Sequence, residues 1–139
     1  MNLYKLEHKR LIDCFNDECI YSTITIGYYS SYNKAQETIS RYINIEGFRD
    51  YQKSSVVQKL KIDKNKIIDN KIYELSHTYE DDDGYDNVTY IGVYPSIKDA
   101  YNKINIIKIL RPYSEYPNNF IVDEYVINED NWCDGFFTY

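Results

Sequence analysis

The sequence predicts an α+β protein made of two tandem copies of a ββαβ unit. Three observations support this prediction. The pentapeptide YKLEH at residues 4–8 recurs as YELSH at residues 73–77. From Ile26 onward the halves align without a gap at an offset of 65 residues, and residues 26–63 share nine identical positions with residues 91–128. Each half also passes in the same order from strand patterns through one helical pattern to a closing strand.

The two pentapeptides are predicted to form half-buried strands. A period of two places Tyr4, Leu6 and His8 on one face and Lys5 on the other, and the second copy repeats this row. The only two histidines of the chain, His8 and His77, therefore occupy equivalent positions.

The second strand of each half is predicted from the segments STITIGYY and NVTYIGVY, in which β-branched and aromatic residues dominate. Gly27 and Gly92 stand at the same position of these two strands. A glycine inside a strand indicates a β-bulge or a close approach of other atoms. We expect one of these features in each half.

A helix is predicted after each second strand. Ser31 and Ser96 are the expected N-caps, and Ser96 with Asp99 resembles a capping box. Gly47 is expected to end the first helix and Pro112 the second. Apolar residues recur on one side of each helix: Tyr32, Ala35, Ile39, Tyr42 and Ile43 in the first half, and Ile97, Ala100, Tyr101, Ile104 and Ile107 in the second.

The closing strands are predicted from VVQKLKI and IVDEYVI. In the first half a period of two places Val56, Leu60 and Ile62 on a common face. Lys59 and Lys61 are then expected on the outer face of this strand. The second half repeats the apolar row in the same register.

Chain geometry predicts the topology of each half. A strand–helix–strand crossover is right-handed and leaves its two strands parallel, so the third strand is expected beside the first. The strand order is then 2-1-3, with the pentapeptide strand in the centre. Because a three-stranded sheet with one helix is marginally stable at about 65 residues, the halves are expected to pack as an internal pseudo-dimer. The predicted boundaries are residues 1–63 for the first repeat, 64–70 for a linker and 71–139 for the second repeat with its aromatic C-terminal tail.

Composition restricts the partners and the compartment. The chain has 22 Asp and Glu against 16 Lys and Arg, a formal net charge of -6, which argues against nucleic acid and anionic membranes and favours a basic partner. No window approaches the roughly 18 apolar residues of a membrane span. With no signal-peptide pattern and three cysteines that form no CxxC motif, we expect a cytoplasmic protein with reduced thiols.

The second half carries YELSHTYEDDDGYDNVTYIGVYPSIKDA, followed by NNFIVDEYVINEDNW and GF. Over about residues 73–136, this pattern resembles a family of small bacterial domains known only as a domain of unknown function. The first half resembles a diverged copy, which keeps YKLEH, IGYYSS and GFRDY but lacks the DEY and W-x-x-GF elements. The resemblance implies a compact α+β unit and supplies no activity, cofactor or catalytic residue.

A cleft between the two halves is one candidate site. His8, His77, Gln58 and Asp123 would converge there as ligand-binding or acid–base groups. The alternative for each histidine is a core imidazole hydrogen-bonded to the backbone. Because the sequence contains no G-x-S-x-G, H-E-x-x-H, P-loop or standard zinc spacing, we predict no catalytic residue, no metal ligand and no cofactor.

The acidic run YEDDDGYDN at residues 79–87 is predicted to form the solvated tip of a hairpin. An EF-hand frame with Gly84 at its turn would place Tyr79 and Tyr90 at the first and last ligand positions, which argues against a calcium loop. We therefore interpret this region as a surface for a protein partner. Its candidate residues are Glu80, Asp81, Asp82, Asp83, Tyr85, Asp86, Val88, Tyr90 and Trp132.

Two classes of function remain. The first is a non-enzymatic cytosolic protein-interaction module, whose most specific form is an immunity-type inhibitor of a basic protein. The second is a small ligand-binding protein or enzyme with its site in the cleft between the repeats. In either class the chain is expected to be a monomer with a pseudo-twofold axis or a homodimer.

Overall fold

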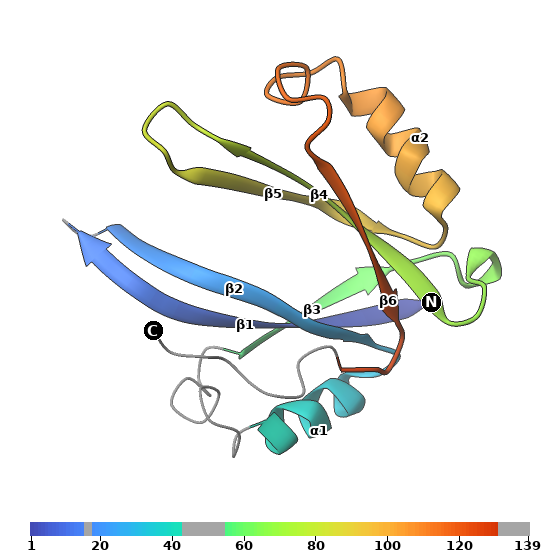
Figure 1. Cartoon of the computed structure of the whole chain (residues 1–139). Coiled ribbons are helices and arrows are strands. Elements are labelled where there is room, and N and C mark those ends of the chain that lie inside the picture. Colours follow the sequence, from blue (N-terminus) through green and yellow to red (C-terminus); the bar gives the residue numbers. More distant parts are fainter. Residues whose placement is uncertain (16–17, 43–54, 131–139) are drawn as a thin grey trace. The chain divides into compact units, whose positions relative to one another are not determined.

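The computed structural model describes the backbone of residues 1–15, 18–42 and 55–130 (Figure 1). Its contacts divide the chain into two compact units. Unit 1 comprises Met1–Lys61 together with Ile127–Tyr139, and unit 2 comprises Ile62–Val126. The chain therefore returns to unit 1 after it has completed unit 2.

Unit 1 is a three-stranded sheet with one helix. Its elements are β1 (Asn2–Phe15), β2 (Glu18–Tyr29), α1 (Tyr32–Tyr42) and β3 (Ser55–Lys61). The strand order is β2-β1-β3, and both outer strands run antiparallel to β1. Strands β2 and β3, which the helix connects, are consequently parallel to each other, as the crossover rule predicts.

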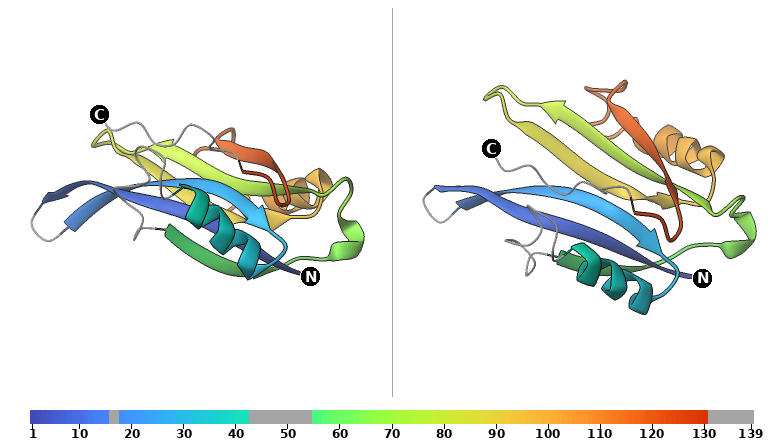
Figure 2. Two further views of the ribbon diagram at one scale, coloured as in Figure 1. Left: turned by 90° about the horizontal axis from the view of Figure 1, so that it is seen from below. Right: turned by 60° about the horizontal axis from the view of Figure 1, so that its bottom comes forward.

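Unit 2 has the same topology. After a short 3-10 turn, η2 (Lys64–Lys66), it contains β4 (Lys71–Glu80), β5 (Asp86–Tyr94), α2 (Ile97–Ile107) and β6 (Phe120–Val126) in the sheet order β5-β4-β6. In both units the helix lies against one face of its own sheet (Figure 2). The α+β class and the strand order are thus confirmed, with each pentapeptide strand in the centre, whereas the tandem duplication stays a prediction.

A β-bulge lies at the same step of both units. In unit 1 the pairing of β1 with β2 shifts after Leu6, which makes Ile26 the extra residue of the bulge. In unit 2 the pairing of β4 with β5 shifts after Leu75, and Ile91 is the extra residue. Each extra residue directly precedes the glycine that predicted the irregularity, so the bulges are confirmed.

The core of unit 1 lies between α1 and the sheet. Its buried members are Leu6, Ile26, Tyr29 and Ala35, and the partly buried Tyr4, Ile39 and Val57 pack against them.

Val56 and Leu60 share one face of β3 as predicted, but the row that packs toward the helix is the other one. Val57 pairs with Leu6 and packs on the core, whereas Val56 is 43% exposed. Lys59, expected on the outer face, belongs to the same row as Val57 because it pairs with Tyr4. The hydrogen-bond register of β3 with β1 decides which row of this edge strand faces the helix. The prediction failed because the pattern of apolar residues does not reveal that register.

Both predicted N-caps are confirmed. The Ser31 hydroxyl accepts a hydrogen bond from the Lys34 amide at 3.2 Å, and the Ser96 hydroxyl accepts one from the Asp99 amide at 3.1 Å. The prediction that Pro112 ends the second helix was wrong, because the last helical residue is Ile107. The chain leaves the helix in a turn closed by the bond from the Leu110 amide to the Ile107 carbonyl at 2.9 Å, so Pro112 lies in the loop that follows. Gly47, the predicted end of the first helix, lies outside the described residues.

Residues 127–130, which the predicted boundaries assigned to the second repeat, contact unit 1, and we call them the docked segment. The Asn128 amide donates to the Tyr28 carbonyl at 2.7 Å, and its side-chain oxygen accepts from the Ser30 amide at 2.9 Å. The Asp130 carboxylate accepts a hydrogen bond from the Tyr29 hydroxyl and forms an ion pair with Arg41 at 2.7 Å. The segment thus covers one end of the edge strand β2.

Neither helix of the described part of the chain has the length and apolar character of a membrane span.

Candidate functional site

An aromatic cluster surrounds His77 in unit 2. His77 lies on the central strand β4 and is fully buried. The Phe120 ring, which the register places beside it on β6, is 4.9 Å away, and the Tyr113 ring from the preceding loop is 4.8 Å away. Both rings meet the imidazole edge to face, which is a favourable geometry between aromatic groups.

One hydrogen bond fixes the imidazole. His77 Nε2 lies 2.9 Å from the Tyr116 carbonyl oxygen. Because a carbonyl only accepts, Nε2 carries a proton, and Nδ1 has no hydrogen-bond partner in the described part of the chain. The Tyr116 ring in turn stacks on Tyr79 at 4.7 Å. This geometry matches the alternative in which the imidazole is a core group bonded to the backbone.

The four residues of the predicted cleft occupy different faces within their units. His8 is fully buried and pairs with Ser55, three residues before Gln58, so Gln58 points to the opposite face of the first sheet. By the same alternation His77 and Asp123 lie on opposite faces of the second sheet. Gln58 and Asp123 are both exposed. A site formed by all four between the halves stays a prediction.

The acidic hairpin between β4 and β5 is organised by Asp81. Its carboxylate accepts hydrogen bonds from the amides of Asp83 and Tyr85, each at 3.0 Å, and from the Asn87 side chain at 3.1 Å. Gly84 adopts a positive φ of 82° in this turn, which a glycine tolerates without strain. The bonds from the Tyr85 backbone, the Asn87 side chain and the Asp83 backbone hold the pKa of Asp81 below its ordinary value of 3.8.

Most residues of the predicted partner surface are exposed. Tyr85 and Val88 are 64% and 70% exposed, and Tyr90 is also exposed. The register places Val88 and Tyr90 on the sheet face opposite His77. We define the hairpin surface by the exposed side chains of Glu80, Asp82, Asp83, Tyr85, Asp86, Val88 and Tyr90. Asp81 is turned into the loop, and Trp132 lies outside the described residues.

Sequence reasoning missed one apolar neighbour of this surface. Ile121 on β6 is exposed and pairs with Ser76, which pairs on its other side with Tyr90. Ile121 and Tyr90 therefore flank the same residue on one face of the sheet. Strand order was needed to find this neighbour, because the two residues are far apart in the sequence.

Lys5 lies on the face of β1 opposite Tyr4 and Leu6, as alternation predicts. Sequence reasoning did not predict its burial, yet Lys5 is only 3% exposed. Its ammonium group forms an ion pair with Glu7 at 3.1 Å and lies 5.9 Å from the centre of the Tyr28 ring. A buried lysine needs such partners, because an unpaired charge is costly to bury.

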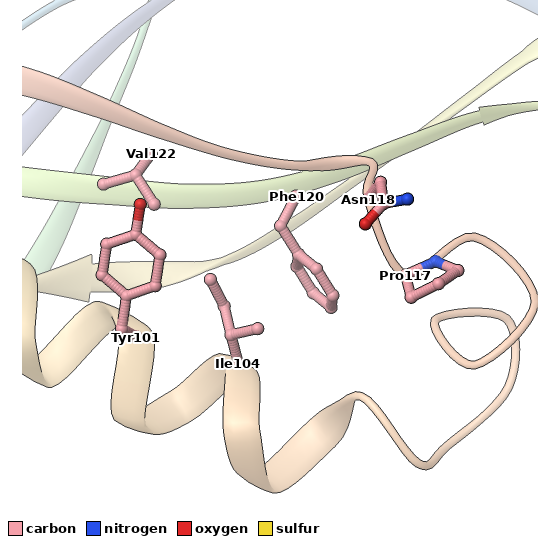
Figure 3. A pocket seen from close by; sticks show the side chains of 6 residues that line it. All are labelled: Tyr101, Ile104, Pro117, Asn118, Phe120 and Val122. Carbon is pink, nitrogen blue, oxygen red and sulfur yellow. The ribbon is translucent and has the colours of Figure 1, made fainter.

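A pocket of about 280 Å³ lies between α2 and β6 (Figure 3). Tyr101 and Ile104 project from the helix toward the strand, which contributes Phe120 and Val122 (Figure 3). Pro117 and Asn118 come from the loop before the strand. The lining residues are Tyr101, Ile104, Pro117, Asn118, Phe120 and Val122. No pattern in the sequence pointed to this pocket, because its lining residues come from a helix, a loop and an edge strand that only the fold brings together.

Within the described residues, no group of three or more His, Cys, Asp or Glu side chains is arranged to hold a metal ion. In comparisons with known proteins, no family model, no curated protein and no solved structure matches the chain. The resemblance to bacterial domains of unknown function stays a prediction. A proposal for the function therefore rests on the chemistry of the described side chains.

Proposed function

We propose that the chain is a non-enzymatic protein-interaction module that binds a basic partner through the hairpin surface. The observation that carries the proposal is the combination of exposed carboxylates with exposed apolar side chains at one hairpin. Asp82, Asp83 and Asp86 supply negative charge beside Tyr85 and Val88, which are 64% and 70% exposed.

The two kinds of side chain have different roles in recognition. Carboxylates at the rim of an interface attract a basic partner and raise its association rate. Tyrosine and other large apolar side chains supply contact area that leaves water on binding, and tyrosine is enriched among residues that dominate binding energy. The hydrogen bonds of Asp81 hold the hairpin loop in place before a partner binds. Both kinds of side chain benefit, because an ordered loop loses less conformational entropy on binding.

In its most specific form the proposal is an immunity-type inhibitor that covers a basic protein. The net charge of -6 supports a basic partner. A hairpin tip that projects carboxylates on a rigid turn suits a positively charged groove, where each carboxylate can meet a cation.

The test begins with photocrosslinking in the source cell. The photoreactive residue p-benzoylphenylalanine replaces Val88 in one variant and Ile106 in a control variant, because both positions are exposed and Ile106 lies on α2. We expect the Val88 variant to crosslink a basic protein that the Ile106 variant does not. The affinity of this protein for the unmodified chain is then measured at low and high salt.

Charge variants test the surface itself. The hairpin variant carries Asp82→Asn, Asp83→Asn and Asp86→Asn, and a control variant carries Glu37→Gln, Asp69→Asn and Glu115→Gln, so both lose three negative charges. Three rim charges at about 0.5 kcal/mol each predict a loss of roughly tenfold in affinity at low salt for the hairpin variant. Equal affinities of the two variants, or a crosslinked partner that is acidic, would overturn the proposal.

A further inference from the structure

The pocket between α2 and β6 has the size of a site for a small ligand. Its volume is about 280 Å³, close to the lower end of the range of about 300 to 1,000 Å³ that is usual for ligand pockets. A closed apolar cavity of about 150 Å³ accommodates benzene. The α2–β6 pocket is open to solvent on the side of Tyr101, Pro117 and Asn118, which are exposed, so it has room for one aromatic ring or two fused rings that stay partly in contact with water.

The lining selects a neutral ligand. Ile104, Pro117, Phe120 and Val122 contribute apolar walls, and none of the six lining residues carries a charge. A charged ligand would lose part of its hydration there and find no ion-pair partner among the lining residues. Two polar groups remain for orientation, because the Tyr101 hydroxyl and the Asn118 amide can each donate or accept a hydrogen bond.

One wall of the pocket is preformed. The Phe120 ring is packed at 4.9 Å from His77 and 5.5 Å from Tyr113, and His77 is fixed by its bond to the Tyr116 carbonyl. The Asn119 carbonyl, next in sequence to the pocket residues, accepts from the Thr78 amide at 3.2 Å and ties the loop to β4. A wall that is already ordered reduces the entropy lost when a ligand binds.

We propose that the α2–β6 pocket binds a small neutral aromatic molecule with one hydrogen-bonding group, of the size of phenol or indole. The ring packs against Ile104, Phe120 and Val122, and its polar group reaches Tyr101 or Asn118. This site is distinct from the hairpin surface, whose Val88 and Tyr90 lie on the opposite face of the same sheet.

The test is an NMR titration of the whole chain with phenol, indole and benzoate. Binding is monitored through the methyl resonances of its isoleucine and valine residues. We expect phenol and indole to give saturable shifts centred on Ile104 and Val122. Benzoate, which has a ring of the same size but a negative charge, is expected to bind at least about tenfold more weakly. Shifts that do not saturate, or an equal response to phenol and benzoate, would overturn the assignment.

Two matched variants locate the site. Ile104→Phe fills the pocket, whereas Ile106→Phe makes the same change on the same helix at a position that is 66% exposed and does not line the pocket. We expect Ile104→Phe to weaken phenol binding about tenfold or more and Ile106→Phe to leave it unchanged. If Ile104→Phe does not fold, the double variant Tyr101→Phe with Asn118→Ala replaces it, because both residues are exposed and the two changes together remove both hydrogen-bonding groups of the pocket. Equal phenol affinity in the pocket variant and the Ile106→Phe control would contradict the proposal.

Discussion

At the residue scale, a buried imidazole is stabilised by hydrogen bonds to its nitrogens and by neighbours that pack against its ring. In His77 one nitrogen, Nε2, bonds to the Tyr116 carbonyl, Nδ1 has no hydrogen-bond partner among the described residues, and Tyr113 and Phe120 pack edge to face against the ring. These contacts match a structural role for His77 in unit 2, and the imidazole packs against the Phe120 wall of the α2–β6 pocket.

Replacement of His77 tests this role. His77→Ala removes a ring and a hydrogen bond, so we expect a loss of about 2–4 kcal/mol in the free energy of unfolding, measured by urea denaturation. The control is Thr89→Ala, because Thr89 pairs with His77 across the sheet and is exposed. This control is expected to change stability by less than about 0.5 kcal/mol. A loss of stability in His77→Ala that is as small as that of the control would show that the imidazole does not support the fold.

The two bulge glycines differ in what surrounds them. A Cβ atom at Gly27 would lie 2.6 Å from the Glu129 carbonyl oxygen, which is backbone of the docked segment. A Cβ atom at Gly92 would lie 3.1 Å from the Tyr94 hydroxyl, the end of a side chain that can shift. The same substitution is therefore predicted to have unequal effects.

We expect Gly27→Ala to cost about 1–3 kcal/mol of stability, because backbone must move to relieve the overlap. Gly92→Ala is expected to stay within about 1 kcal/mol, since a small shift of the Tyr94 ring suffices and the alanine restricts the unfolded chain. Thermal unfolding of the two variants side by side measures the difference. An equal cost at both glycines would contradict the close approach of the docked segment.

At the element scale, the hairpin between β4 and β5 owes its turn to a side chain. The Asp81 carboxylate accepts two backbone hydrogen bonds and one from Asn87, and these bonds favour its ionised form. The strands around it pair in regular register from Glu80 to the bulge. A run of acidic residues thus contains one carboxylate that shapes the loop and several that face solvent.

This arrangement predicts a pH dependence. Because the pKa of Asp81 is lowered in the folded chain, its contribution to stability is present above the ordinary value of 3.8 and is lost as pH falls through the lowered value. The stability difference between the wild type and Asp81→Ala should be smaller at about pH 3 than at about pH 7. Urea denaturation at both pH values measures it.

Asp82→Ala serves as the control for this prediction. It removes a neighbouring exposed carboxylate and leaves the hydrogen bonds of Asp81 in place. This variant should therefore keep the pH dependence that Asp81→Ala loses. If the free energy of unfolding of wild type and Asp81→Ala differs by the same amount at both pH values, the ionised Asp81 carboxylate does not stabilise the loop.

At the scale of the whole molecule, the chain does not divide at one point. Residues 127–130 follow β6 of unit 2 but bond to Tyr28, Tyr29, Ser30 and Arg41 of unit 1. Unit 1 is therefore completed only by residues that the chain supplies after unit 2.

Two truncations test this dependence. A chain that ends after Val126 lacks the docked segment, and a chain that ends after Asp130 keeps it. We expect amide hydrogens of β2 and α1 to exchange about tenfold faster or more in the shorter chain, a loss of about 1.4 kcal/mol in local stability. Amides of β4 and β5 should change much less. Equal exchange rates in the two truncated chains would show that the docked segment does not stabilise unit 1.

The sequence by itself determined the elements and the order of the strands. Alternation at the two pentapeptides, glycines at the bulges and serines at the N-caps are local signals, because each depends on backbone geometry within a few residues. The rule for crossover connections then places the pentapeptide strand in the centre of each sheet. The acidic hairpin tip also followed from local turn chemistry.

Only the tertiary structure decided the features that depend on distant residues. The row of β3 that faces the helix follows from its register with β1, which places Val57 and not Val56 on the core. The burial of Lys5, the docking of residues 127–130 and the pocket beside Phe120 each join groups that are far apart in the chain or depend on how elements cover one another. Sequence periodicity reports which residues share a face, whereas packing determines what that face meets.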